Sequence, residues 1–260
     1  MNKLCFMLIM TSFFSTAVFS SPYRLSYERE VLYFTAGGLM TLVGTVSEKD
    51  REGPSETELS ELNKNDVPQF DRYYAGRWNK DAQNASDVFL AAGFAVPVSM
   101  MATERQDFPI LATMYLQTFL ITAGGVQLAK GSVTRYRPFV YGDTAPDNEK
   151  QARDANRSFF SGHTALASAG FVFTATVFSD YYPESTYKPY VWSAALAGSL
   201  FTGWLRMEGG KHFPSDVLVG LAWGSLVGYS VPALHRQKTQ YRVSPFVSAD
   251  YAGLRFLRIF

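Results

Sequence analysis

The sequence predicts an all-α protein, an antiparallel bundle of about five to six apolar helices. Several stretches of helical length carry no charged residue and are separated by short charged breaks. These stretches are rich in Gly, Ala, Ser and Thr, which let membrane helices approach one another closely. They lack the alternating apolar period of a β-strand, so the pattern favours helices.

The composition leans toward a membrane protein. Charged residues make up 18% of the 260 positions, against about 25% in ordinary soluble domains, while 47% are hydrophobic and 15% aromatic. The mean hydropathy of −0.05 shows that the apolar bias is confined to parts of the chain. The formal net charge of +1 gives no reason to expect nucleic acid as a partner.

Residues 1–20 are predicted to be a secretory signal peptide. Lys3 provides a basic start, residues 4–19 form an uncharged apolar run, and Ser20 and Ser21 permit cleavage nearby. A retained membrane anchor is the alternative interpretation. The only cysteine is Cys5, so a cleaved chain would have neither a disulfide nor a cysteine metal ligand.

Residues 21–87 are interpreted as an N-terminal helix followed by a polar surface segment. The uncharged stretch 31–47 is marginal as a membrane span, at about 17 residues. Acidic and basic residues are mixed from residue 48 to 80, and Ser55 with Glu58 forms a helix-capping pattern. Asp66, Asp71 and Arg72 fall in this segment, where a solvated face is the favoured interpretation.

Residues 88–235 form the predicted helical bundle. Its apolar segments are residues 88–103, 109–129, 159–179, 189–205 and 217–234. Gly124–Gly125 and the series Gly220, Gly224 and Gly228 suit close helix contacts. Residues 236–260 form a tail rich in β-branched and aromatic residues, with a turn signal around residues 249–253, and a short β-hairpin is predicted there.

Residues 205–216 carry the clearest chemical signal. Pro214 suits the first position of a helix, and Gly209–Gly210 allow a tight turn before it. His212 and Asp216 are four positions apart, so on a helix they share a face, and the Asp216 carboxylate is expected to accept a proton from the imidazole ring. An imidazole oriented by a carboxylate is suited to act as a nucleophile or base.

Other ionisable residues fall at the ends of the same apolar segments. In an antiparallel bundle these ends lie on one side, which gathers Lys130, Arg137, His163, Arg206, His212 and Asp216 at one mouth. Three cations, with the N–H groups of a helix start at Ser161 and Gly162, are suited to bind a tetrahedral dianion. The two imidazoles then remain for attack and for protonation of a leaving oxygen. The third histidine, His235, is expected on the surface.

Three motifs carry a resemblance to a known family. They are Lys-x6-Arg-Pro (Lys130, Arg137, Pro138), Ser-Gly-His (residues 161–163) and Arg-x5-His-x3-Asp (Arg206, His212, Asp216). In this order they resemble the type 2 phosphatidic acid phosphatase superfamily, which includes bacterial acid phosphatases and vanadium haloperoxidases. The likeness covers residues 88–234. The sequence departs from the family pattern at Phe160, where Pro is usual, and at Leu205, where Ser is usual.

The resemblance implies a site and a mechanism. His212 would form a phosphohistidine, Asp216 would orient it, and His163 would be the general acid. The phosphoryl oxygens would be held by Lys130, Arg137, Arg206 and the backbone of Ser161 and Gly162. Neither a metal ion nor a cofactor is implied.

The expected protein is therefore a metal-independent phosphatase that hydrolyses a lipid phosphomonoester or pyrophosphate. Its expected partners are a lipid phosphate and the membrane, and its expected place is the bacterial inner membrane with the site facing the periplasm. The alternatives are a soluble periplasmic acid phosphatase, a vanadium haloperoxidase and a non-catalytic membrane protein that binds anions. The motifs specify neither the physiological substrate nor the oligomeric state.

Overall fold

The computed structural model describes residues 21–237, 240–247 and 252–259. Residues Tyr23–Arg236 form one compact unit. In the C-terminal part of the chain, β1 (Gln240–Val247) pairs antiparallel with β2 (Ala252–Ile259), so the predicted short hairpin is present. The predicted signal peptide, residues 1–20, lies outside the described residues.

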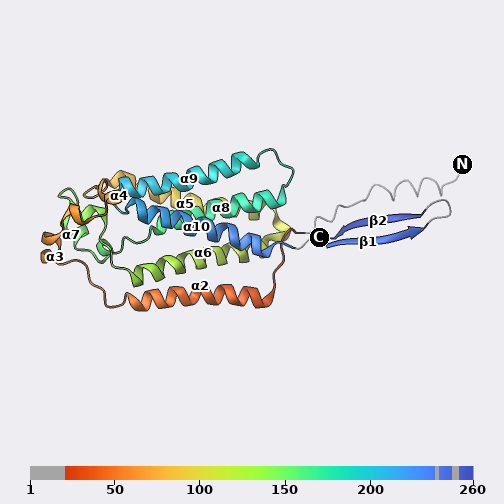
Figure 1. The fold of residues 1–260 in the computed structure, drawn as a ribbon, viewed down its shortest axis with the longest axis horizontal. Coiled ribbons are helices and arrows are strands. Elements are labelled where there is room, and N and C mark those ends of the chain that lie inside the picture. Colours follow the sequence, from red (N-terminus) through yellow and green to blue (C-terminus); the bar gives the residue numbers. More distant parts are fainter. Residues whose placement is uncertain (1–20, 238–239, 248–251, 260) are drawn as a thin grey trace. The chain divides into compact units, whose positions relative to one another are not determined.

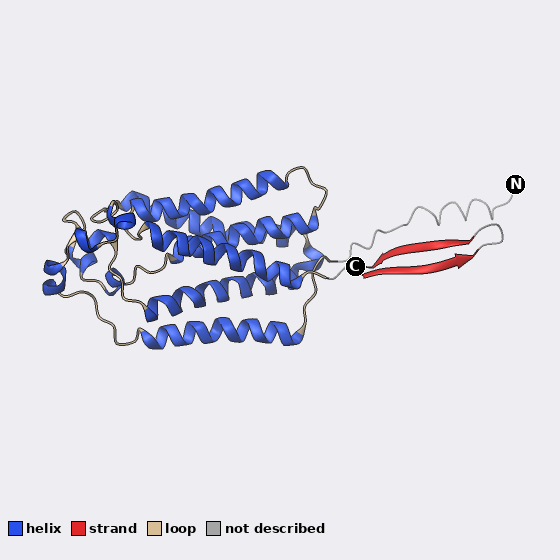
Figure 2. Cartoon of the chain, in the orientation of Figure 1, coloured by secondary structure: helices blue, strands red, loops and turns tan. Residues whose placement is uncertain are grey.

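Long helices build the unit Tyr23–Arg236, which confirms the predicted all-α bundle (Figure 1). Figure 2 shows that its remaining segments are loops and short helices. The central helix is α8, which packs against α5, α6, α9 and α10, while α2 packs along α6. The long helices are α2 (Tyr27–Ser47), α5 (Lys80–Thr103), α6 (Phe108–Ser132), α8 (Gly162–Tyr181), α9 (Lys188–Glu208) and α10 (Pro214–His235).

The helix starts follow local capping rather than the limits of the uncharged stretches. Helix α5 begins at Lys80, before the uncharged stretch, because the Asn79 side chain accepts a hydrogen bond from the Ala82 N–H at 3.1 Å. Helix α10 begins with Pro214 at its first position, as predicted. Before it, Gly210 has φ +71°, and a Cβ there would lie 1.9 Å from the Arg77 carbonyl oxygen, so this turn requires glycine.

A polar cap covers one end of the bundle (Figure 1). We define the polar cap as residues 48–79 and 133–161. The predicted capping box is present in it: the Ser55 hydroxyl accepts from the Glu58 N–H at 3.3 Å, and the Glu58 carboxylate accepts from the Ser55 N–H at 2.8 Å. Its short helices are α3 (Glu56–Glu61), η1 (Lys64–Asp66), α4 (Gln69–Arg72), η3 (Pro138–Tyr141), α7 (Asp147–Lys150) and η4 (Arg153–Asn156), while η2 (Arg105–Asp107) joins α5 to α6.

Glycines allow α10 to lie directly against α8. A Cβ added at Gly224 would lie 2.0 Å from the carbonyl oxygen of Ala165, and one added at Gly228 would lie 2.5 Å from that of Ala169. Both obstacles are backbone atoms of the buried central helix. The close helix contacts predicted from these glycines are therefore confirmed.

Replacing Gly224 with alanine is expected to lower the melting temperature of the detergent-solubilised protein. The neighbouring backbone oxygen cannot rotate away, and overpacking of this kind typically costs about 1–3 kcal/mol. Gly38→Ala on α2 is the matched control, because its added Cβ meets nothing within 4 Å. Equal melting temperatures for the two variants would contradict the close contact between α8 and α10.

Four helical stretches are long and apolar enough to cross a membrane: Tyr27–Ser47, Lys80–Thr103, Arg105–Ser132 and Pro214–His235. Helix α2 is longer than its uncharged stretch, because its first turn includes charged residues. Much of its outer surface is apolar, and Leu32, Leu39, Leu42 and Val46 are each more than half exposed. Large apolar side chains exposed along a whole helix fit a lipid environment.

The end of the bundle away from the polar cap holds a buried polar cluster, which corrects the expected surface position of His235. The Nδ1–H of His235 donates to the Val231 carbonyl at 2.7 Å, and its Nε2 lies 2.9 Å from Glu30 Oε2. The same Glu30 oxygen accepts from Gln117 Nε2 at 2.6 Å. His235 is buried because Glu30 of α2 supplies a partner that is 205 residues away in the sequence.

Candidate active site

Four helix ends meet beneath the polar cap. They are the C-terminal ends of α6 and α9 and the N-terminal ends of α8 and α10. The residues predicted to lie at one mouth are found together here. Their proximity is shown by the pKa of His212, which is lowered by the charges of Arg137, Arg206, Lys130 and His163. Asp216 adjoins the same histidine, and Ser161 donates its backbone N–H to the Asp216 carbonyl at 3.1 Å.

His212 lies in the tight loop before α10 and is 1% exposed. Its Nδ1 is 2.7 Å from the carbonyl oxygen of Ser158 and 3.7 Å from Asp216 Oδ2. A carbonyl can only accept a hydrogen bond, so Nδ1 carries the proton, and Nε2 keeps its lone pair. The structure thus differs from the expectation that Asp216 accepts the ring proton: Ser158 accepts it, and Asp216 acts on the ring from a greater distance.

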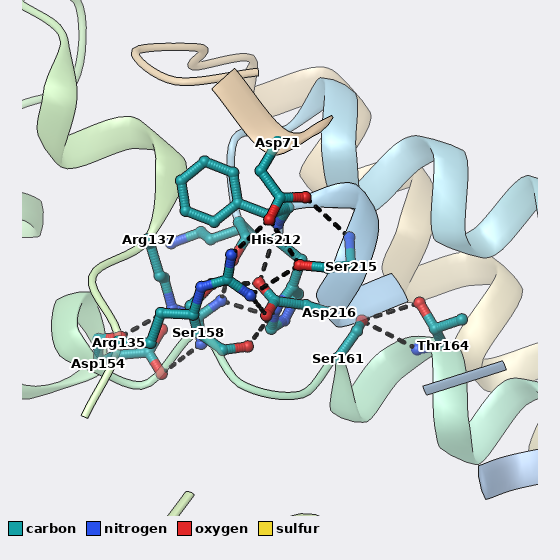
Figure 3. A network of polar contacts seen from close by, with 12 residues as sticks. Asp71, Arg135, Arg137, Asp154, Ser158, Ser161, Thr164, His212, Ser215 and Asp216 are labelled. Carbon is teal, nitrogen blue, oxygen red and sulfur yellow. Dashed lines mark hydrogen bonds and ion pairs between the residues drawn. The ribbon is translucent and has the colours of Figure 1, made fainter. Parts of the chain in front are cut away.

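Asp216 is held by a buried network that reaches into the polar cap (Figure 3). Its carboxylate accepts from the Ser158 hydroxyl at 2.6 Å and from the Phe213 N–H at 2.9 Å. It also forms an ion pair with Arg135. These contacts fix both the carboxylate and the loop that carries His212.

Arg135 bridges Asp216 to Asp71, a residue of α4. Its Nη2 lies 2.6 Å from Asp71 Oδ2, and Asp71 also accepts from the hydroxyl of Ser215 at 2.7 Å and from the Ser215 N–H at 2.9 Å. Asp71 is buried, so interpreting it as part of a solvated face is wrong. Its burial is compensated because its carboxylate is paired and hydrogen-bonded.

Arg137 lies beside Nε2 of His212. Its Nη1 is 3.2 Å from His212 Nε2 and donates to the Lys211 carbonyl at 2.7 Å. Its other nitrogens donate to Asp154, to the backbone carbonyl from Nε and to the carboxylate from Nη2, both at 2.7 Å. These bonds fix the orientation of the guanidinium, with Nη1 next to His212 Nε2.

Two further basic residues lie at this end of the bundle, Arg206 and Lys130. Arg206 is buried, and its Nη1 donates to the Ser86 hydroxyl at 3.1 Å, but its Nε has no hydrogen-bond partner among the described residues. The Lys130 ammonium lies close to the start of α8, since a Cβ added at Gly162 would be 3.9 Å from Nζ. Buried, unsatisfied donors of positive charge are suited to an anionic ligand.

The N-terminal end of α8 faces this cluster. Ser161 is its N-cap, and its side chain accepts from the Thr164 N–H at 3.4 Å (Figure 3). The N–H groups of Gly162 and His163 head the helix, where no preceding turn supplies acceptors. A helix start of this kind binds phosphate oxygens readily.

His163 stands on the first turn of α8, and its side chain is 30% exposed. Its Nε2 is 2.8 Å from Asp87 Oδ1 of α5. A positive charge on His163 lowers the pKa of His212, so the two histidines lie at the same end of the molecule.

Burial and neighbouring positive charges keep the His212 ring neutral. Burial lowers the pKa of His212 well below 6.5, and the charges of Arg137, Arg206 and Lys130 lower it further. Burial alone would raise the pKa of Asp154, but Arg137 and Lys130 bring it down to about 2. A neutral imidazole beside several cations is the state that can attack a phosphorus atom.

Activity is expected to persist at lower pH than an ordinary histidine would allow. If His212 attacks phosphorus, its ring must be neutral, and the lowered pKa keeps it neutral below pH 6.5. The acidic limb of kcat/KM, which reports on the free enzyme, should therefore lie below pH 6.5. The measurement is kcat/KM against pH, corrected for the second ionisation of the substrate phosphate, which has a pKa of about 6. A limb at or above pH 6.5 would contradict a buried neutral nucleophile.

Several residues of the site carry no motif in the sequence. Asp87 and Ser86 precede the matched motifs, and the Ser158 carbonyl is a backbone group that no sequence pattern marks. Arg135 stands two positions before Arg137, and nothing in the sequence indicates that it pairs with Asp71 and Asp216. Among the residues that the structure describes, no group of three or more His, Cys, Asp and Glu side chains could hold a metal ion.

Residues 109–240 match the PAP2 superfamily. The chain belongs to the PAP2 superfamily. It is 28% identical over 148 residues to phospholipid phosphatase 1 of Rattus norvegicus, a match that covers 46% of this chain and 52% of the relative. It is 31% identical over 151 residues to phospholipid phosphatase 2 of Homo sapiens, covering 47% and 52%. The chain spans about half the length of these two relatives.

A solved structure is also similar, that of a transmembrane PAP2-type phosphatidylglycerolphosphate phosphatase from Bacillus subtilis. It is 18% identical, with a TM-score of 0.46, and the match covers 89% of this chain and 92% of that one. The PAP2 match begins at residue 109. Asp71, Ser86 and Asp87 therefore contact the site from outside the matched region.

Proposed function

We propose that this PAP2 protein is a phosphatase that hydrolyses a lipid phosphomonoester or pyrophosphate through a phosphohistidine on His212, without a metal ion. One observation carries the proposal. The buried, neutral ring of His212 presents Nε2 beside Arg137, in a cluster of cations whose other donors are partly unsatisfied.

The proposed reaction has two displacements. His212 Nε2 attacks phosphorus, the bond to the leaving oxygen breaks, and His163 gives that oxygen a proton. Water then attacks the phosphohistidine, loses a proton to His163, and inorganic phosphate leaves. The Ser158 carbonyl and the nearby Asp216 carboxylate stabilise the positive charge that His212 gains as it attacks. Lys130, Arg137, Arg206 and the N–H groups at the start of α8 stabilise the phosphoryl oxygens.

A lipid substrate is supported by the surroundings of the site. The protein has four helical stretches that can cross a membrane, and the site lies at their polar-cap end. A phosphate head group would reach the cations there, while its tails would stay among apolar helices. Two PAP2 relatives are named phospholipid phosphatases, which supports the same substrate class.

The test is release of inorganic phosphate by the purified full-length protein in the presence of EDTA. The substrate panel contains phosphatidic acid, phosphatidylglycerol phosphate, undecaprenyl pyrophosphate, lipid A phosphates and a soluble aryl phosphate. Turnover of at least one lipid substrate, at a higher kcat/KM than the aryl phosphate, is expected. Preference for the aryl phosphate would favour a soluble-type acid phosphatase, and vanadate-dependent bromination without phosphate release would favour a haloperoxidase.

We also propose that the site faces the periplasm. The helix directions then restrict what can happen to residues 1–20. Helix α2 runs in the same direction as α6, since Gly37 lies against Leu120 and Gly44 against Gln127. If α2 crosses the membrane, Tyr23 and the site lie on opposite sides. A periplasmic site is then compatible with retention of residues 1–20 and incompatible with their removal by an export signal peptidase.

Cysteine labelling in intact cells is expected to decide the orientation. In a Cys5→Ser background, Asp143→Cys places a thiol in the exposed polar cap, and Thr186→Cys places one in the exposed loop between α8 and α9. A membrane-impermeant maleimide should label the first variant and spare the second. The reverse pattern would place the site in the cytoplasm and support cleavage near residue 20.

A further inference from the structure

Asp87 of α5 stands against the proton donor of the proposed reaction. His163 Nε2 is 2.8 Å from Asp87 Oδ1, and a carboxylate can only accept, so Nε2 carries a proton. The other ring nitrogen, Nδ1, is left to exchange a proton with substrate. We propose that Asp87 is a positioning residue that holds the His163 ring in the orientation required of a general acid, with Nε2 bound to the carboxylate and Nδ1 left for the substrate. This inference rests on the proposed function.

The surroundings of His163 show why such a partner is needed. Burial, together with the positive charges of Arg206 on α9 and Lys130 on α6, lowers the pKa of His163 to about 4. Asp87 faces the ring, and its hydrogen bond and charge act in the opposite direction, in favour of the imidazolium. Without Asp87, the pKa of His163 would be lower still, and the ring would carry its acidic proton less often.

The first two turns of α5 contact three parts of the candidate site. Gln83 donates through Nε2 to the Gly209 carbonyl at 2.8 Å, next to the loop that carries His212. Ser86 accepts from Arg206 at 3.1 Å, and Asp87 holds His163. Positions 83, 86 and 87 share one helix face. Helix α5 thus contacts a phosphate-binding cation, the nucleophile loop and the acid, although it precedes the matched region.

The proton balance of the first displacement follows from this geometry. The imidazolium of His163 donates from Nδ1 to the leaving oxygen as the P–O bond breaks. The neutral ring that remains keeps its proton on Nε2, which stays hydrogen-bonded to Asp87. In the second displacement water gives a proton to Nδ1, which restores the imidazolium. The Asp87 carboxylate accepts the Nε2–H bond in both displacements, in the manner of the carboxylate in a Ser-His-Asp triad.

The experiment compares Asp87→Asn with the wild type on phenyl phosphate and 4-nitrophenyl phosphate, and on the best lipid of the panel. A poor leaving group needs protonation, whereas 4-nitrophenolate leaves without it. The quantity compared is kcat/KM, which reports on the steps up to the departure of the leaving group and excludes hydrolysis of the phosphohistidine. We expect kcat/KM to fall about tenfold or more on phenyl phosphate and on the lipid, since general acid catalysis contributes about 10²–10⁴-fold. On 4-nitrophenyl phosphate we expect kcat/KM to fall less than about threefold.

Asp81→Asn is the matched control, because Asp81 is an exposed carboxylate on the first turn of the same helix. It should leave all rates unchanged, and Asp87→Glu should restore part of the loss. The Asp87 side chain is 62% exposed, so its pair adds little stability and the melting temperature of Asp87→Asn should match the wild type. Equal losses on both aryl phosphates, or no loss on either, would overturn the inference. Absence of turnover by the wild type on every substrate would instead overturn the proposed function and the inference with it.

Discussion

Replacing His212 with alanine should lower phosphate release by at least about 10³-fold, because the variant lacks the proposed nucleophile. The three cations and the start of α8 remain in place. Binding of inorganic phosphate or vanadate, measured by calorimetry, should therefore change by less than about tenfold, or about 1.4 kcal/mol. The variant separates a catalyst from a protein that merely binds anions.

The two measurements have distinct contrary outcomes. Unchanged phosphate release would show that His212 is not the nucleophile. Loss of both turnover and anion binding, with a lower melting temperature, would show that the ring is needed to hold the loop through its bond to Ser158. Trapping of a 32P-labelled, acid-labile and base-stable adduct on the wild type, and its absence from the variant, would identify the phosphohistidine directly.

Replacing Arg137 with glutamine should lower kcat by about 10²–10³-fold, the usual cost of removing a donor that stabilises transition-state charge. The loss has a second cause here. Arg137 neutralises Asp154, whose pKa of about 2 keeps it ionised. Without the guanidinium this carboxylate would repel the incoming phosphate, so KM should rise as well.

Arg137→Lys should recover little of the activity. The guanidinium serves His212, Asp154 and the Lys211 carbonyl at once, and a single ammonium cannot reproduce that fork. Arg72→Gln is the matched control, because Arg72 is exposed and its side chain donates to the backbone carbonyls of Val67 and Asn65, away from the site. Wild-type kcat for Arg137→Lys would show that charge alone suffices.

The helix bundle and the gathering of motif residues at one end could be predicted because helix direction alternates along the chain. Lys130 closes one helix and His163 opens the next long one, so their proximity follows from connectivity. The same logic could not place Asp71 and Asp87. Their contacts depend on the path of the polar cap and on how α5 rotates about its axis, and neither leaves a local pattern.

Two errors have the same physical origin. His235 looked like a surface residue because it stands at a helix end beside an arginine, yet Glu30 from a distant helix makes burial favourable. Asp71 looked solvated because it lies in a segment of mixed charge, yet Arg135 pairs with it. The sequence shows that a residue is ionisable, whereas only the fold shows whether a counter-charge meets it.

The bridge from Asp71 through Arg135 to Asp216 determines how the molecule can be divided. A fragment limited to residues 109–240 would keep all three motifs, yet it would lack one carboxylate of the bridge and the whole of α5. Grafting the motifs onto another bundle would keep the Arg135–Asp216 pair but remove Asp71, which also holds Ser215 beside the loop that carries His212. The smallest transferable catalytic module of this protein therefore begins upstream of Asp71, well before its recognisable signature.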